Sequence, residues 1–202
     1  MRARIYDAAI ARMTAGWYRA VLEHLPPGSR VLDVGIGTGT ALLQNAAEVV
    51  GRDLRVTGID IDADYVVRCA RAIASLGLGS RIGVRLESVY DHRGGPYDAV
   101  YFSGSFMLLP DPAGALRRLS GSLAPGGRLY FTQTFEQRRS RALETLKPLL
   151  HLLTTIDFGR VTYEADFRRA LDDGGMDLEE LQPLHQGRGR VAMLAVARPR
   201  AS

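Results

Sequence analysis

The sequence has few of the residues that mark a disulfide-stabilised or membrane-spanning protein. It contains one cysteine, Cys69, so an internal disulfide is excluded and a reducing, cytoplasmic location is expected. Charged residues interrupt the first ten positions, where a signal peptide would lie, and no apolar run is long enough for a transmembrane helix. We therefore expect a cytoplasmic protein with no membrane span.

Charges of one sign are not clustered either. The chain carries 26 basic and 22 acidic residues, a net charge of +4, without a run of five like charges. A nucleic-acid interface requires a basic stripe, so no nucleic-acid partner is expected. Histidine, cysteine and carboxylate residues lack the spacing of metal ligands, so no metal site is expected.

The chain has 202 residues, 46% of them hydrophobic, which suits one domain over residues 1–202. A lead helix is expected within 1–27. Strands and helices then alternate, which predicts a parallel sheet covered by helices on both faces. The expected strands are 30–34, 54–60, 81–87, 97–103 and 128–135, and the expected helices are 39–50, 63–77 and 111–123.

The C-terminal part departs from this alternation. Helices are expected over 138–152 and 163–173, followed by β-rich runs at 176–184 and 190–198. The link between these two runs is too short for a crossover, so the sheet is expected to end in a hairpin with one antiparallel strand.

The most informative stretch is 31–39, in which a buried strand is followed by Gly35, Gly37 and Gly39 and then by a helix. Such a loop brings bare backbone against a ligand at the helix N-terminus. A dinucleotide fingerprint requires G-x-G-x-x-G, but Thr40 occupies the place of its third glycine. The preceding Asp33 would repel a pyrophosphate, and it favours a cationic or zwitterionic ligand.

This stretch, Val-Leu-Asp-Val-Gly-Ile-Gly-Thr-Gly, resembles motif I of the class I S-adenosylmethionine-dependent methyltransferases. The resemblance continues at Asp60, at Tyr97-Asp98-Ala99-Val100 and at Leu123-Ala124-Pro125-Gly126-Gly127-Arg128-Leu129. It implies an α/β, Rossmann-like, doubly wound sheet of seven strands in the order 3-2-1-4-5-7-6, with the last strand antiparallel and helices on both faces.

The resemblance also implies a set of roles for binding S-adenosylmethionine, with S-adenosylhomocysteine as product. Asp33 would serve the amino group, and Asp60 the ribose. Ser88 stands where many members carry an acid for the adenine amine, so Tyr90 or a backbone carbonyl is an alternative partner. The full expected set is Asp33, Gly35, Gly37, Gly39, Asp60, Ile61, Ser88, Val89, Ser103 and Tyr6.

The acceptor is expected above the carboxyl ends of strands four and five. Strand four lacks the Asp/Asn-Pro-Pro-Tyr motif of amide and base N-methyltransferases, which favours a small-molecule acceptor. Segment 138–162 is expected to cover this acceptor, and His151 is the candidate general base. The other candidate acceptor residues are Phe106, Met107, Thr132, Thr134 and Arg160. Phe106 and Met107 could equally be core, and Gln133 with Phe135 could replace the threonine pair.

Two other functions remain open from the sequence. A methyltransferase fold could be retained for binding or as a partner subunit, without catalysis. A nicotinamide-dependent oxidoreductase is the other alternative, but the sole lysine, Lys147, follows Leu143 rather than a tyrosine four positions earlier. With about 27 residues before the first strand, we expect no large cap domain, and we expect the acceptor pocket to be open or to be closed by a second copy in a homodimer.

Overall fold

The computed structural model describes residues 2–136, 162–187 and 189–200, with side chains from residue 13 onward. The first half contains α1 (Arg2–His24), β1 (Arg30–Val34), α2 (Thr40–Leu43), α3 (Ala46–Gly51), β2 (Arg55–Asp60), α4 (Ala63–Ser75) and β3 (Ile82–Leu86). The second half contains β4 (Tyr97–Ser103), η1 (Phe106–Leu108), α5 (Pro112–Ser120), β5 (Leu123–Glu136), α7 (Glu164–Asp173), β6 (Met176–Gln186) and β7 (Arg190–Pro199).

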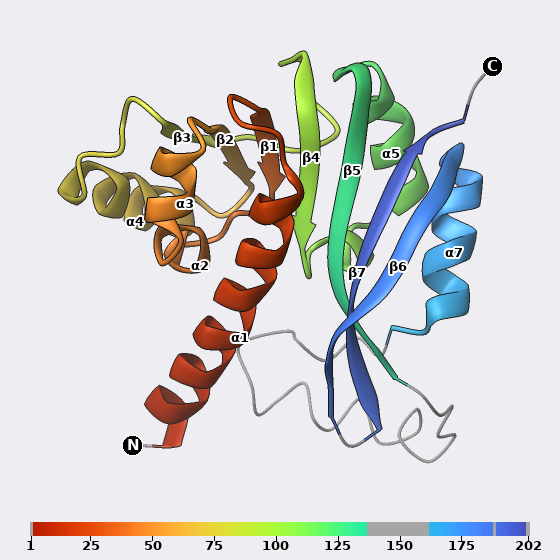
Figure 1. Ribbon diagram of the computed structural model, residues 1–202, viewed down its shortest axis with the longest axis horizontal. Coiled ribbons are helices and arrows are strands. Elements are labelled where there is room, and N and C mark those ends of the chain that lie inside the picture. The colour runs from red at the N-terminus through yellow and green to blue at the C-terminus, as the bar shows by residue number, and fades with distance from the viewer. Residues whose placement is uncertain (1, 137–161, 188, 201–202) are drawn as a thin grey trace.

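The strands form one seven-stranded sheet in the order β3-β2-β1-β4-β5-β7-β6 (Figure 1). Strands β1 to β5 pair in parallel, and β7 runs antiparallel to both β5 and β6. The predicted order and the reversed last strand are therefore confirmed. Asp33 lies opposite Gly58 on one side and Tyr101 on the other, so β1, β2 and β4 end at the same edge.

Two apolar cores lie on the two faces of this sheet. One face packs against α1, α2, α3 and α4, and the other packs against α5 and α7. The N-terminal half of α1 and the far ends of β5, β6 and β7 project beyond the carboxyl edge of the sheet on the same side (Figure 1). The carboxyl edge of the sheet is therefore flanked by α1 and by the long strands.

The expected helix over 39–50 is wrong in one respect, because the structure divides it into α2 and α3. The division falls at Asn45, whose backbone is not helical and whose side chain is buried. The Asn45 amide donates to the carbonyls of Ala15 and Ala41, at 2.9 Å each. The break therefore provides a polar contact that fixes α1 against the helices following the glycine loop.

The expected strand over 128–135 begins earlier in the structure. Strand β5 starts at Leu123, where it pairs with Tyr97, and its register shifts before Arg128 pairs with Ala99. The Pro-Gly-Gly turn thus lies inside a β-bulge rather than before the strand. The expected helix over 138–152 lies outside the described residues.

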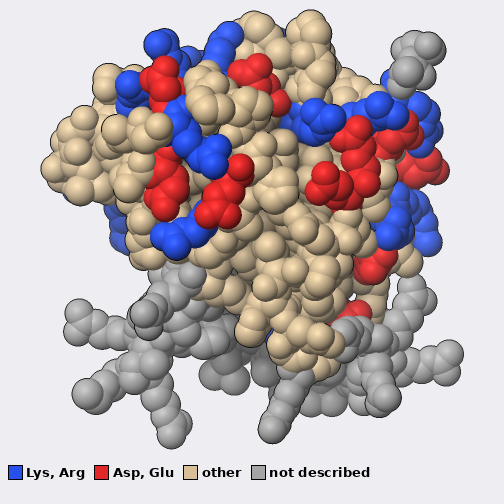
Figure 2. Space-filling view, viewed as in Figure 1, with Lys and Arg blue, Asp and Glu red and all other residues tan. Residues whose placement is uncertain are grey.

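Acidic and basic side chains are interspersed on the face seen in Figure 2, where several gather over β6 and β7. Glu179 pairs with Arg128 at 2.6 Å and with Arg198 at 3.5 Å, and Arg200 pairs with Asp172 and Asp177. These groups thus neutralise one another. Within the ranges the structure describes, no helix is both long enough and apolar enough to cross a membrane.

Phe131 lies at the centre of an aromatic cluster that joins the sheet to α7. It is 1% exposed, stacks on Phe102 with ring centroids 5.2 Å apart, and meets Phe106 and Phe167 edge-on. We expect Phe131→Ala to lower the free energy of unfolding by about 3–5 kcal/mol, because it leaves a cavity among three rings. Urea denaturation measures this loss. Phe131→Leu should cost clearly less, and equal losses for the two variants would contradict the packing account.

Candidate cofactor and acceptor site

The glycine loop after β1 is shaped by left-handed backbone at Gly35, Gly37 and Gly39, whose φ angles are +77°, +61° and +70°. A side chain at Gly39 would place its Cβ 2.6 Å from the Sγ of Cys69, and one at Gly35 would place it 2.7 Å from the Cβ of Ser105. Both distances are shorter than packing allows. Glycine is therefore required both for the turn and for its close seating against α4 and the β4–η1 loop.

Asp60, the last residue of β2, connects this loop to the start of α4. Its Oδ2 accepts the N–H of Gly37 at 2.8 Å, and its Oδ1 accepts the N–H of Asp62 at 2.9 Å. A carboxylate has about four acceptor positions, so both oxygens can still receive a ligand hydroxyl. The next residue, Ile61, is 77% exposed and presents an apolar surface beside this carboxylate.

Asp33 lies behind the loop and is 1% exposed. The hydroxyl of Tyr18, on α1, donates to its Oδ2 at 2.7 Å, whereas its buried Oδ1 has no hydrogen-bond partner among the described residues. Burial raises the pKa of Asp33 to about 7, the Tyr18 hydrogen bond lowers it, and the charge of Asp60 raises it. This carboxylate thus retains one acceptor oxygen that no described side chain uses.

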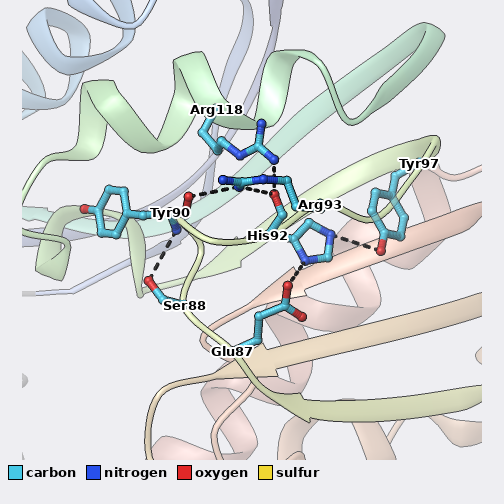
Figure 3. Close-up of polar contacts among 7 residues, drawn as sticks. All are labelled: Glu87, Ser88, Tyr90, His92, Arg93, Tyr97 and Arg118. Carbon is cyan, nitrogen blue, oxygen red and sulfur yellow. Dashed lines mark hydrogen bonds and ion pairs between the residues drawn. The ribbon is translucent and has the colours of Figure 1, made fainter.

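The loop after β3 is held by a buried histidine (Figure 3). His92 is fully buried, with its Nδ1 2.9 Å from Oε1 of Glu87 and its Nε2 3.2 Å from the hydroxyl oxygen of Tyr97. The Arg118 side chain donates to the backbone carbonyl of His92. The N–H of Glu87 donates to the carbonyl of Asp60 at 2.9 Å, so this network fixes the loop beside the end of β2.

Ser88 and Val89 lie in this fixed loop. The hydroxyl oxygen of Ser88 accepts the N–H of Tyr90 at 3.3 Å, and Val89 is 4% exposed in the core. The Tyr90 hydroxyl donates to the carbonyl of Asp111 and accepts its N–H. Tyr90 is therefore already engaged at the start of α5, which favours Ser88 or the loop backbone as the polar group offered to a ligand.

At the ends of β4 and β5, the expected cofactor residue Ser103 and the expected acceptor residues fall into two sets. Ser103, Met107 and Thr134 are partly exposed. Phe106 is 1% exposed within the aromatic cluster, and Thr132 is fully buried with its hydroxyl 2.8 Å from that of Tyr101. We therefore correct the expectation for Phe106 and Thr132, whose side chains belong to the core in this structure.

Three expected residues cannot be placed. His151 and Arg160 lie outside the described residues, and Tyr6 is in α1 at a position where the side chain is not described. Among the residues that are described, no group of three or more histidine, cysteine or acidic side chains is placed to hold a metal ion.

Sequence reasoning missed two buried partners. Tyr18 lies three and four positions before Val21 and Leu22, on the same buried face of α1, and this spacing is the signal that could have placed it against the sheet. Nothing in the local pattern indicates that His92 is buried, because Gly94, Gly95 and Pro96 follow it as a turn would. The structure places the hydroxyl of Tyr97, five positions later at the start of β4, 3.2 Å from the Nε2 of His92.

Comparison with known proteins identifies this arrangement. The methyltransferase domain family matches residues 32–129. The ubiquinone biosynthesis O-methyltransferase of Xanthomonas axonopodis is 37% identical over 110 residues, which are 53% of this chain and 44% of that protein. Of the solved structures, a SAM-dependent methyltransferase from Aquifex aeolicus has a TM-score of 0.68 and 21% identity, covering 89% of this chain and 88% of that one. The cyclase SpnF has a TM-score of 0.70 and 19% identity, covering 95% of this chain and 82% of that one.

The fold and the edge at which its loops meet define the Rossmann-like class of nucleoside-binding α/β proteins. The strand order, the domain match and the curated relatives support the class I S-adenosylmethionine-dependent methyltransferase family for this chain. The chain spans about half the length of the first curated relatives it matches. The cyclase with the same fold shows that architecture alone does not determine the reaction.

The buried state of Asp33 predicts a pH dependence of stability. An unfolded aspartate loses its proton near pH 4, whereas folded Asp33 keeps it up to about pH 7. The folded state therefore binds more protons between these values, and the free energy of unfolding falls as the pH rises through this window. We expect this fall to be absent in Asp33→Asn, as measured by urea denaturation from pH 4 to pH 8. A constant difference between the two proteins would contradict the assignment.

The His92 network predicts a selective loss of stability. His92→Ala leaves the hydroxyl of Tyr97 and the carboxylate of Glu87 without their buried partner, at a cost of about 1–3 kcal/mol. Thermal and urea denaturation measure this cost. His185 is exposed on β6, so His185→Ala should stay within about 0.5 kcal/mol of the parent protein. A similar loss for the two variants would show that His92 is not the organising group.

Proposed function

We propose that this chain transfers the methyl group of S-adenosylmethionine to an oxygen atom of a small-molecule acceptor. The observation that carries the proposal is that the glycine loop, Asp60 and the Asp33 oxygen that lacks a described partner meet at the common edge of β1 and β2. The cofactor has an α-ammonium, a ribose diol and an adenine, and this edge offers a chemically matched group for each of them.

The residues present fit the cofactor at three points. Asp60 has free acceptor positions for two adjacent ribose hydroxyls while it holds Gly37. Ile61 gives the adenine an exposed apolar surface. Ser88 lies in the loop after β3, which the His92 network fixes beside the end of β2. The bare backbone at Gly35 and Gly37 lets the amino-acid part approach closely, and Asp33 offers an acceptor to its ammonium.

When bound, the cofactor supplies an electrophilic methyl group on a sulfonium. Because displacement at that carbon requires an in-line approach, the main task of the protein is to position the acceptor oxygen. Ser103, Met107 and Thr134 have partly exposed side chains at the ends of β4 and β5, where such an acceptor would lie. In this proposal His151 removes the proton of the acceptor hydroxyl as general base, and Arg160 forms part of the cover over the acceptor. Both residues belong to the segment 138–162.

Several features support the choice of acceptor. Curated relatives named for ubiquinone biosynthesis and for nocamycin are both O-methyltransferases. After β4 the chain reads Ser103-Gly104-Ser105-Phe106 instead of the Asp/Asn-Pro-Pro-Tyr motif of base methylation. The proposal therefore includes a small organic hydroxyl compound as acceptor rather than a nucleic acid, a cytoplasmic location, and a homodimer as the form that closes the acceptor side.

Binding of S-adenosylhomocysteine by titration calorimetry tests the cofactor assignment. We expect Asp60→Ala to weaken this binding at least about tenfold, because hydrogen bonds to a charged carboxylate are worth about 1.5–3 kcal/mol. Asp64 is exposed in the first turn of α4, so Asp64→Ala is the matched control and should bind like the parent protein. No binding to the parent protein at high micromolar concentration would refute the proposed function.

Turnover distinguishes an enzyme from a binding protein of the same fold. The parent protein is incubated with methyl-labelled S-adenosylmethionine and a panel of phenols, enols and alcohols, and labelled product is counted. Transfer of label to one acceptor class supports the O-methyltransferase assignment. Tight cofactor binding with no transfer to any acceptor would instead favour the non-catalytic alternative.

A further inference from the structure

The contact between Tyr18 and Asp33 joins two elements that the sequence separates. Tyr18 is 3% exposed on α1, and its hydroxyl donates to Oδ2 of Asp33 at 2.7 Å. Its ring meets the ring of Tyr101 edge-on, with the centroids 4.9 Å apart, so the phenol has little freedom to turn away. One oxygen of Asp33 is thereby fixed by α1.

The second oxygen of Asp33 is the informative one. Oδ1 is buried and accepts no hydrogen bond from any described residue, although a buried carboxylate oxygen ordinarily has a partner. The described groups that act on the carboxyl are Tyr18, which donates to it, and Asp60, which is itself acidic. Neither supplies a positive charge, so the unpartnered oxygen of Asp33 is electrostatically suited to a cation from outside the protein.

We propose that Tyr18 is a positioning residue, which holds Asp33 by Oδ2 so that Oδ1 is presented to the α-ammonium of the cofactor. The ammonium donates to Oδ1 directly or through one ordered water. The inference rests on the proposed function, and it assigns to α1 a part in binding the amino-acid end of the cofactor. The adenosine end is held elsewhere, at Asp60, Ile61 and the loop containing Ser88.

The division between the two ends of the ligand makes the inference testable. S-adenosylhomocysteine carries the α-ammonium, whereas 5′-methylthioadenosine has the same nucleoside and sulfur but no amino-acid group. Removal of the Tyr18 hydroxyl should therefore affect only the first ligand. A general loosening of the site would instead weaken both ligands.

Titration calorimetry with both ligands is the test. For Tyr18→Phe we expect about tenfold weaker binding of S-adenosylhomocysteine, and binding of 5′-methylthioadenosine within about twofold of the parent protein. Tyr130→Phe is the matched control, because Tyr130 is buried in the same core but lies on β5, two strands away from Asp33, and lines a separate cleft with Gly28 and Gly126. This control should leave both affinities unchanged.

A second variant, at Asp33 on β1, tests the same contact without changing α1. Asp33→Asn should show the same selective loss, and the double variant should lose little beyond Asp33→Asn alone, because the two residues act through one contact. Equal weakening of both ligands in Tyr18→Phe, or unchanged binding of S-adenosylhomocysteine, would overturn the inference while the proposed function stands. Failure of the parent protein to bind S-adenosylhomocysteine would overturn both.

Discussion

The carboxylate of Asp33, buried at the end of β1, is the constraint on which the cofactor side of this molecule depends. A charge in this position costs free energy unless it is paired. Of the residues that the structure describes, one neutral donor, Tyr18, binds one oxygen of this carboxylate, and none of them binds the other oxygen. A bound ammonium would reduce that cost directly, so binding of the ligand and ionisation of Asp33 favour each other. The hydrogen bond from Tyr18 to the same carboxylate also joins α1 to the end of β1.

Asp60 performs the complementary task on the exposed side of the loop. It accepts the N–H of Gly37 and so fixes the loop against the end of β2, while Glu87 joins the same strand end through the carbonyl of Asp60. His92 contacts Glu87 and is itself contacted by Tyr97. The glycine loop, the start of α4 and the loop after β3 are thus all fixed at the end of β2 without a ligand. Such preorganisation lowers the entropic cost of binding.

Much of the cofactor side could be predicted from the sequence, because its signals are local. Three glycines after a buried strand, an acid before them and an acid at the end of the next strand define the loop without long-range information, and the strand order follows from the family pattern. The Tyr18–Asp33 contact depends on how α1 packs against β1, and the His92–Tyr97 contact depends on how the turn before β4 folds back, and periodicity encodes neither of them. Thr132 was assigned to the acceptor because alternation cannot distinguish a pocket from a core on the same face, and Phe106 was assigned there because an apolar residue after β4 fits either place. The acceptor segment 138–162 carries no motif that specifies its ligand.

A crystal structure with S-adenosylhomocysteine is the most direct measurement of the central claim, that this strand edge is built for a sulfonium amino acid joined to a nucleoside. The account predicts the ribose hydroxyls on Asp60, the adenine over Ile61, and the α-ammonium within hydrogen-bond reach of Asp33, directly or through one water. A ligand bound at this edge in the reverse direction, with its nucleoside towards Asp33 and its amino-acid group on Asp60, would contradict it.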